Sequence, residues 1–190
     1  LAVGNLKDLA ALASKNPGQL NFGSAGVGSS VHMMGELFKL AAKAPITHVP
    51  YKGSSAALND LMGGQIQLMF ENPPTVIQHV KAGKLKALAV TGKQRLAALP
   101  EVPTGIESGY PAFEATSWTT IAVGAKVPDA IADKLNADIR KVVNSPEFRK
   151  GLEDQGMTPV ANARDVAAKF IVSEKARWDK VIEQGKVNAD

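Results

Sequence analysis

The chain has 190 residues, of which 45% are apolar and 21% charged, so its composition is that of a globular protein and excludes disorder. Its formal net charge of +4 suits an acidic small ligand or an anionic surface but is too diffuse for nucleic acid, and the 5% of aromatic residues offers few platforms for stacking bases. Cysteine is absent, which excludes disulfides, thiolate nucleophiles and Cys-ligated zinc.

Helix and strand patterns alternate over the first half of the chain. Helical periodicity together with capping serine, proline and glycine residues predicts four helices, over residues 5–15, 30–43, 54–62 and 73–82. Short apolar or alternating runs predict four strands, over residues 20–22, 46–49, 65–70 and 85–90. Such alternation predicts an α/β fold with a mostly parallel sheet and helices on both of its faces.

The second half of the chain has a different pattern. Residues 95–115 are rich in proline and glycine and predict a connection. One strand, Ser117–Val123, is then followed by three helices that begin near residues 128, 145 and 164. The last of these is expected to bury Val166, Phe170, Ile171, Trp178 and Val181.

This pattern divides the chain into a ligand-binding lobe, residues 5–116, and the C-terminal part of another lobe, residues 117–190. Because one strand forms no sheet alone, the partner strands of 117–123 are expected from residues before Leu1 or from a partner chain. No apolar run approaches the roughly 20 residues of a membrane span.

The loop Gly23–Ser30 is the most informative segment. It follows a predicted strand and precedes a predicted helix, at the sheet edge where α/β folds bind ligands. A helix N-terminus presents free N–H groups and a partial positive charge, so it attracts anions. The loop lacks the lysine of a phosphate-binding loop, since Ser29 takes that place, and it has Val31 where a dinucleotide fingerprint has its third glycine. A smaller anion such as a carboxylate is therefore favoured over a plain glycine-rich turn.

Two further strand ends resemble this arrangement. Pro50–Ser55 joins a strand to a helix and offers the Tyr51 hydroxyl and N–H donors, although a solvated turn with a capping serine fits equally well. In Phe70–Pro74, Glu71 and Asn72 could bind polar groups of a ligand, but an N-cap role for Asn72 before Pro73 is favoured about two to one.

No catalytic, metal or cofactor site is predicted. His32 follows the first loop without a readable catalytic partner, and His48 and His79 occupy strand and helix positions. The chain has no metal-binding histidine spacing, no nucleophile elbow and no marked carboxylate pair. We therefore expect a binding protein rather than an enzyme.

Several separated motifs together resemble one family. They are Leu20–Ser30 with His32, Gly35–Phe38, His48–Ser54, Gly63–Phe70, Gly83–Val90, Leu99–Thr104, Ser117–Trp118 and Arg177–Trp178. In this order they resemble the Bug family, the extracytoplasmic solute receptors of tripartite tricarboxylate transporters. The resemblance extends along essentially the whole chain.

The resemblance implies a periplasmic binding protein of the type II kind, with two α/β lobes and a small carboxylate bound in the cleft between them. Its partners would be that carboxylate and the membrane permease subunits of the transporter, with no cofactor, no nucleic acid and no span of its own. Matched to the family's motifs, the implied ligand-binding residues are Ser24, Ala25, Gly26, Gly28, Ser29, Ser30, His32, Tyr51, Lys52, Gly53, Ser54 and Asn72.

The family's N-terminal stretch, which builds most of the first lobe, has no counterpart in this sequence, and neither does a signal peptide. The resemblance therefore implies that the first lobe is incomplete in this chain. The alternative is the effector-binding lobe of a LysR-type transcription regulator, which has a similar two-lobed fold.

Overall fold

A computed structural model describes residues 1–188. The helices are α1 (Leu6–Lys15), α2 (Ser30–Ala42), α3 (Ser54–Met62), α4 (Pro73–Lys81), α5 (Asp129–Val143), α6 (Pro146–Glu153), α7 (Arg164–Gly185) and a short 3-10 helix, η1 (Pro111–Phe113). The strands are β1 (Asn21–Ser24), β2 (Thr47–Pro50) and β3 (Leu68–Met69). The bounds of α1 to α4 lie within one residue of the sequence prediction, and α5, α6 and α7 begin within one residue of the predicted starts.

The three strands form one parallel sheet in the order β2-β1-β3, which confirms the predicted parallel topology. The strand β3 is shorter than the predicted 65–70. At its start the side-chain oxygen of Gln67, rather than a backbone carbonyl, accepts the Asn21 N–H at 2.9 Å. The backbone ladder between β1 and β3 is therefore confined to two residue pairs.

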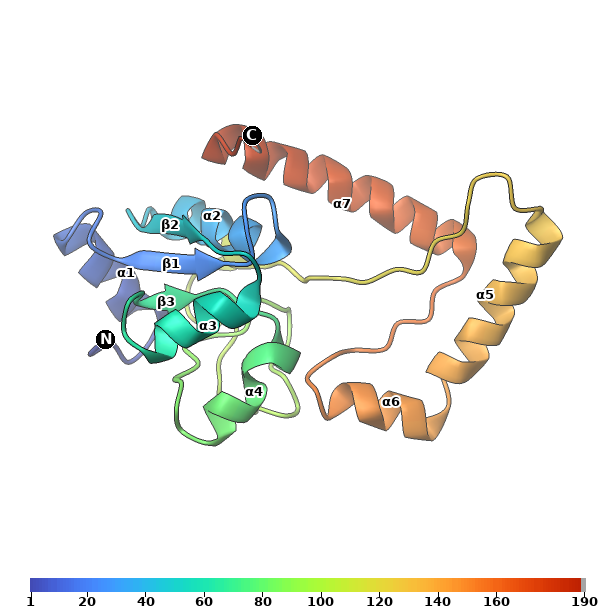
Figure 1. The fold of residues 1–190 in the computed structure, drawn as a ribbon, viewed down its shortest axis with the longest axis horizontal. Helices are drawn as coiled ribbons and strands as arrows, with labels where there is room; N and C mark the ends of the chain where they lie inside the picture. Colours follow the sequence, from blue (N-terminus) through green and yellow to red (C-terminus); the bar gives the residue numbers. More distant parts are fainter. Residues whose placement is uncertain (189–190) are drawn as a thin grey trace.

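Helices cover both faces of the sheet, as expected (Figure 1). Alternate residues of β1 face opposite helices. The Phe22 ring lies against Gly35 of α2, whereas a side chain at Gly23 would meet Ala57 of α3. Phe22 and Phe38 are fully buried with Phe113, and the rings of Phe38 and Phe113 are 5.2 Å apart. The core therefore lies mainly between β1, α2 and η1.

The helices α5 and α6 lie apart from the sheet; one long extended segment leads from the sheet region to α5, and another joins α6 to α7 (Figure 1). The helix α7 begins near α5 and ends against α2, so that Val181 is buried in the main core. Within residues 1–188, no helix combines the length and the apolar character that a membrane crossing needs.

Two predicted strands do not form. Residues 85–90 pair only at Val90, which forms a single parallel bridge with Thr104. Residues 117–123 are extended and exposed, and no strand lies beside them among residues 1–188. The predicted crossing strand is therefore an extended segment, because a strand without a neighbour has no ladder to join.

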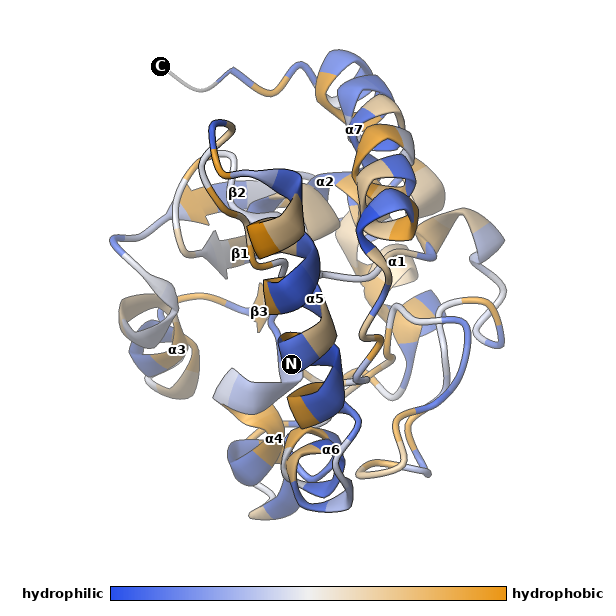
Figure 2. Cartoon of the chain, turned by 90° about the vertical axis from the view of Figure 1, so that its right-hand side faces the viewer, coloured by the Kyte–Doolittle hydropathy of each residue, from blue (hydrophilic) through white to orange (hydrophobic). Residues whose placement is uncertain are grey.

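The predicted buried face of α7 is correct only at its C-terminal end. Val181 is buried and Trp178 packs against the main core, but Val166, Phe170 and Ile171 remain 47%, 40% and 37% exposed. Apolar side chains also remain exposed on α5, as at Ile131 (52%), and hydrophobic patches are visible on both helices in Figure 2. The helical period identifies an apolar face but not whether anything covers it.

Candidate functional site

The first loop lies at the carboxyl end of β1 and leads directly into α2. Gly26 and Gly28 have φ values of +128° and +75°, which L side chains rarely adopt, so glycine is needed at both positions. The buried Ser24 hydroxyl accepts a hydrogen bond from the Gly26 N–H at 3.1 Å. The loop is therefore a defined turn held by its own side chains.

Ser29 is the N-cap of α2. Its hydroxyl accepts the His32 N–H at 3.3 Å and donates to the Gly26 carbonyl at 2.7 Å. Among residues 1–188, no acceptor is found for the N–H groups of Ser30 and Val31, the first two residues of the helix. These donors and the positive end of the helix dipole together can bind a carboxylate.

Two further predicted residues of this segment are His32 and Ala25, and His32 lies behind the loop. Its side chain is buried, and its Nδ1 accepts the Gly28 N–H at 3.0 Å. Ala25 is half-buried at the bend between Ser24 and Gly26. The structure therefore places Ser29 and Ser30 at the helix start and His32 in the interior.

The second loop lies beside the first. The Tyr51 N–H donates to the Ser24 carbonyl at 3.1 Å, and a Cβ at Gly26 would lie 3.4 Å from the Tyr51 carbonyl oxygen. The Tyr51 hydroxyl donates to Asp60 of α3 at 2.8 Å, and this hydrogen bond raises the pKa of Tyr51. The phenol is therefore already engaged within the protein.

The start of α3 differs from the prediction. Its N-cap is Gly53, with a φ of +114°, and neither Ser54 nor Ser55 caps the helix. Lys52 is exposed and Ser54 half-buried next to this glycine. The prediction of a capping serine was wrong because Gly53 occupies the N-cap position with a positive φ that favours glycine, although the helix begins at Ser54 as predicted.

The third segment follows β3 at the same edge of the sheet. Asn72 is the N-cap of α4 by position, but its side chain makes no capping hydrogen bond. Its backbone N–H instead donates to Glu71 Oε1 at 2.8 Å, and Glu71 Oε2 is buried without a partner. The Asn72 side chain thus remains available for other contacts.

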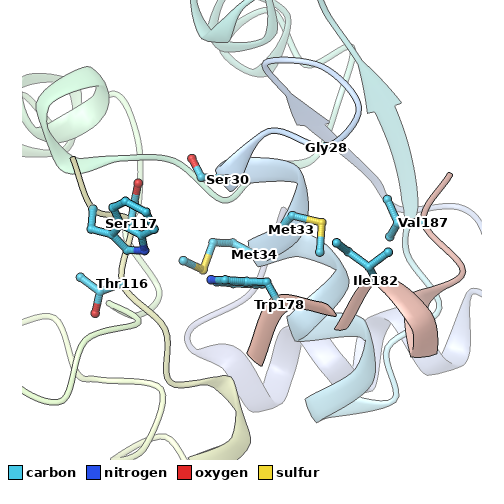
Figure 3. Close-up of a pocket in the computed structure, with 10 residues that line it drawn as sticks. Gly28, Ser30, Met33, Met34, Thr116, Ser117, Trp178, Ile182 and Val187 are labelled. Atoms are coloured by element: carbon cyan, nitrogen blue, oxygen red, sulfur yellow. The ribbon is translucent and has the colours of Figure 1, made fainter. Parts of the chain in front are cut away.

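A pocket of about 400 Å³ adjoins the first loop (Figure 3). Gly28, Ser30 and Ser117 contribute polar groups to its lining, and apolar side chains come from α2 and α7. Figure 3 shows Met34 and Trp178 next to each other in its lining. The remaining lining residues are Met33, Thr116, Trp118, Ile182 and Val187.

Of the twelve predicted residues, only Gly28 and Ser30 line this pocket. The sequence predicts Trp178 in the core and Met34 on the apolar face of its helix, and it gives neither of them, nor Met33, a place in a binding site. Their helical spacing indicates an apolar face and gives no sign that the face borders a cavity. Ser117 and Trp118 were noted only as part of the crossing segment.

Two histidines, His32 and His48, lie beside the first loop together with the free N–H groups at the start of α2. Within residues 1–188, no three His, Cys, Asp or Glu side chains are gathered as a metal site would need. Burial lowers the pKa values of His32 and His48, the latter to about 4, so both imidazoles are neutral near pH 7. The available chemistry is hydrogen-bond donation to an anion.

A family model described as "Tripartite tricarboxylate transporter family receptor" matches residues 2–187. The protein BugT of Bordetella pertussis is 35% identical over 184 residues, which are 97% of this chain and 56% of BugT. The chain thus spans about half the length of the curated relatives it matches.

Two solved structures from Rhodopseudomonas palustris are also similar. Rpa4515, solved with adipate, has a TM-score of 0.92 and 33% identity, covering 98% of this chain and 62% of its own. MatC, solved with bound malate, has a TM-score of 0.84 and 29% identity, and the match covers 94% of this chain and 62% of MatC. The predicted α/β fold of periplasmic binding proteins is confirmed by these matches, and this chain corresponds to about three fifths of it.

Proposed function

We propose that the chain, which belongs to the tripartite tricarboxylate transporter receptor family, is the larger part of a periplasmic receptor that binds a small carboxylate. The receptor would pass this ligand to the membrane permease subunits of a tripartite tricarboxylate transporter. The LysR-type alternative has no support in these matches, since the family model is that of a receptor.

The observation behind the proposal is the start of α2. There the N–H groups of Ser30 and Val31 have no protein acceptor among the described residues, while Ser29 already caps the helix. Two unsatisfied donors at the positive end of a 13-residue helix match the two oxygens of a carboxylate. Tyr51, Lys52, Gly53, Ser54 and Asn72 are the proposed contacts from the two neighbouring strand ends.

Ligand class follows from the same geometry. Loops at three adjacent strand ends can engage more than one polar group, which favours a dicarboxylate or an acidic amino acid over a monocarboxylate. The adipate and malate in the two R. palustris structures are dicarboxylates, in agreement with this proposal. Binding would favour a closed arrangement of the two lobes only insofar as the closed state binds the ligand better.

The test is calorimetric titration with mono-, di- and tricarboxylates and acidic amino acids, with the diamide of the best ligand as a neutral control. Both this chain and a full-length receptor containing it are titrated. Thermal unfolding gives a second readout. A ligand at a concentration 100-fold above its Kd adds about 2.7 kcal/mol to the free energy of unfolding, which for a chain of this size raises Tm by roughly 5–10 °C. Binding of a dicarboxylate but not of its diamide supports the proposal. If the full-length protein binds no carboxylate, or binds the diamide equally well, the proposal is wrong.

A further inference from the structure

A pair of stacked histidines lies directly behind the first loop. The ring centroids of His32 and His48 are 3.7 Å apart and their planes differ by 14°. The Phe22 ring lies 4.9 Å from the His48 ring, so the pair rests on the apolar core. His32 is 5% exposed. The family resemblance implies ligand contact for His32 and no role for His48, whereas the donors at the start of α2 are backbone N–H groups.

Each histidine is hydrogen-bonded to a different end of the loop. His32 Nδ1 accepts the Gly28 N–H at 3.0 Å. His48 Nε2 shares a hydrogen bond of 2.6 Å with the Ser24 hydroxyl, which in turn accepts the Gly26 N–H. The two rings therefore determine where the loop leaves β1 and where it approaches α2.

The bond to Gly28 also determines the tautomer of His32. Because Nδ1 accepts a hydrogen bond, the ring proton lies on Nε2, which faces Glu36 Oε1 at 3.5 Å. Glu36 is itself held by Lys39 at 2.9 Å. A second proton on His32 would occupy Nδ1 and replace an attractive contact with Gly28 by a repulsive one.

We propose that His32 and His48 are positioning residues of the carboxylate loop, which hold Gly28 and Ser24 in place so that the N–H groups of Ser30 and Val31 stay free for the ligand. This inference rests on the proposed function and revises one part of it: His32 acts through Gly28 and does not contact the ligand. His32 must be neutral in this role, because only a neutral ring has an acceptor at Nδ1.

The test compares two substitutions at His32. His32→Asn keeps an acceptor near the position of Nδ1 and cannot be protonated, whereas His32→Leu removes the acceptor and strands a backbone donor. Because the hydrogen bond that holds the Gly28 N–H in place is lost, His32→Leu is expected to raise Kd for the best dicarboxylate about tenfold. His32→Asn is expected to stay within about threefold of the wild type. Phe38→Leu, a buried change on α2 away from the loop, controls for general loss of stability.

The pH profile provides a readout that a packing role would not change. The charged groups that act on His32 are Glu36 and Lys39 on α2, and those that act on His48 are His32 and Lys39. Wild-type affinity is expected to fall as the pH is lowered from 6.5 through the lowered pKa of His32. His32→Asn is expected to remain flat, apart from protonation of the ligand itself, until His48 titrates near pH 4. Equal acid loss in both proteins would contradict the inference.

Amide hydrogen exchange separates this inference from the proposed function, because it needs no ligand. The Gly28 amide is expected to be protected in the wild type and in His32→Asn, and to exchange at least tenfold faster in His32→Leu. The Gly26 amide is expected to respond in the same way to His48→Leu. If no carboxylate binds the wild type, the proposed function fails while exchange still decides the positioning role. Unchanged protection of Gly28 in His32→Leu would overturn that role.

Discussion

Gly35 of α2 lies against the ring of Phe22 of β1 with no space between them for a side chain. This close approach brings the start of α2 next to the carboxyl end of β1 and so shapes the loop that joins them. The Phe22 ring also packs against the His48 ring, so the contact between Gly35 and Phe22 affects the position of His48 behind the first loop.

We expect Gly35→Ala to destabilise the protein even though alanine is the better helix former. The helix preference favours alanine by about 1 kcal/mol, but forcing a methyl group into this packed contact costs about 1–3 kcal/mol. The matched control is Gly151→Ala in α6, where a Cβ would meet nothing within 4 Å. Thermal unfolding should show a lower Tm for the first variant and an unchanged or higher Tm for the second.

Substitutions at Ser29 separate charge from capping. Aspartate and asparagine are both good N-caps, so both variants should keep α2 intact. Ser29→Asp places a negative charge at the carboxylate site and is expected to abolish binding, whereas Ser29→Asn should retain it. Titration calorimetry on the two variants makes the comparison, and retained affinity in Ser29→Asp would contradict a carboxylate ligand.

Both tryptophans of the chain, Trp118 and Trp178, line the pocket next to Gly28 and Ser30. A ligand bound at the start of α2 is therefore expected to change the intrinsic fluorescence. Trp178→Phe and Trp118→Phe would assign the change to one ring or the other. Saturable binding by calorimetry with no fluorescence change in the wild type would place the ligand away from this pocket.

Glu107 is expected to titrate far below an ordinary glutamate. Its hydrogen bonds from Arg95 at 3.0 Å and from the Thr104 N–H at 2.7 Å lower its pKa to about 2. The contribution of this group to stability is present above pH 4.5 and is lost as the pH falls to about 2. NMR titration should find the low pKa, with Arg95→Gln raising it and Arg140→Gln leaving it unchanged.

The protein should also lose stability between about pH 6.5 and pH 4. Burial and the neighbouring His32 and Lys39 lower the pKa of His48 from 6.5 to about 4, so in this range the unfolded chain binds a proton that the folded chain does not. Urea unfolding across the range should show this decline. The part due to His48 ends near pH 4, and the loss of the Glu107 contribution continues below it. His48→Gln is expected to reduce the decline, and His79→Gln on α4 serves as the control.

The elements that could be predicted from sequence are those with local causes. The helix α2 has an apolar period, a serine cap and a following proline, and its observed bounds match the prediction. Residues 85–90 and 117–123 have equally good strand composition, but a strand forms only where a neighbour accepts its hydrogen bonds. Only Val90 finds one.

The candidate site likewise has features with local causes, which the sequence predicts, and features that depend on tertiary packing. The glycines and serines of the first loop are recognisable because a strand, a flexible turn and a helix start follow one another in the chain. The engagement of Tyr51 with Asp60 and the burial of His32 could not be predicted, since each depends on where a second element packs. The apolar wall formed by Met34 and Trp178 joins residues far apart in the sequence.

By itself, the sequence determined the class of fold, the order of helices and the position of the glycine-rich loop at the start of α2. It did so because helix periods, caps and turn residues act over a few neighbours. The tertiary structure alone decided which donors of that loop are already used and which remain free. Stacking of His32 on His48 and the pairing of β1 with β2 bring together residues from separate segments, and the hydrogen bonds of the loop depend on that packing.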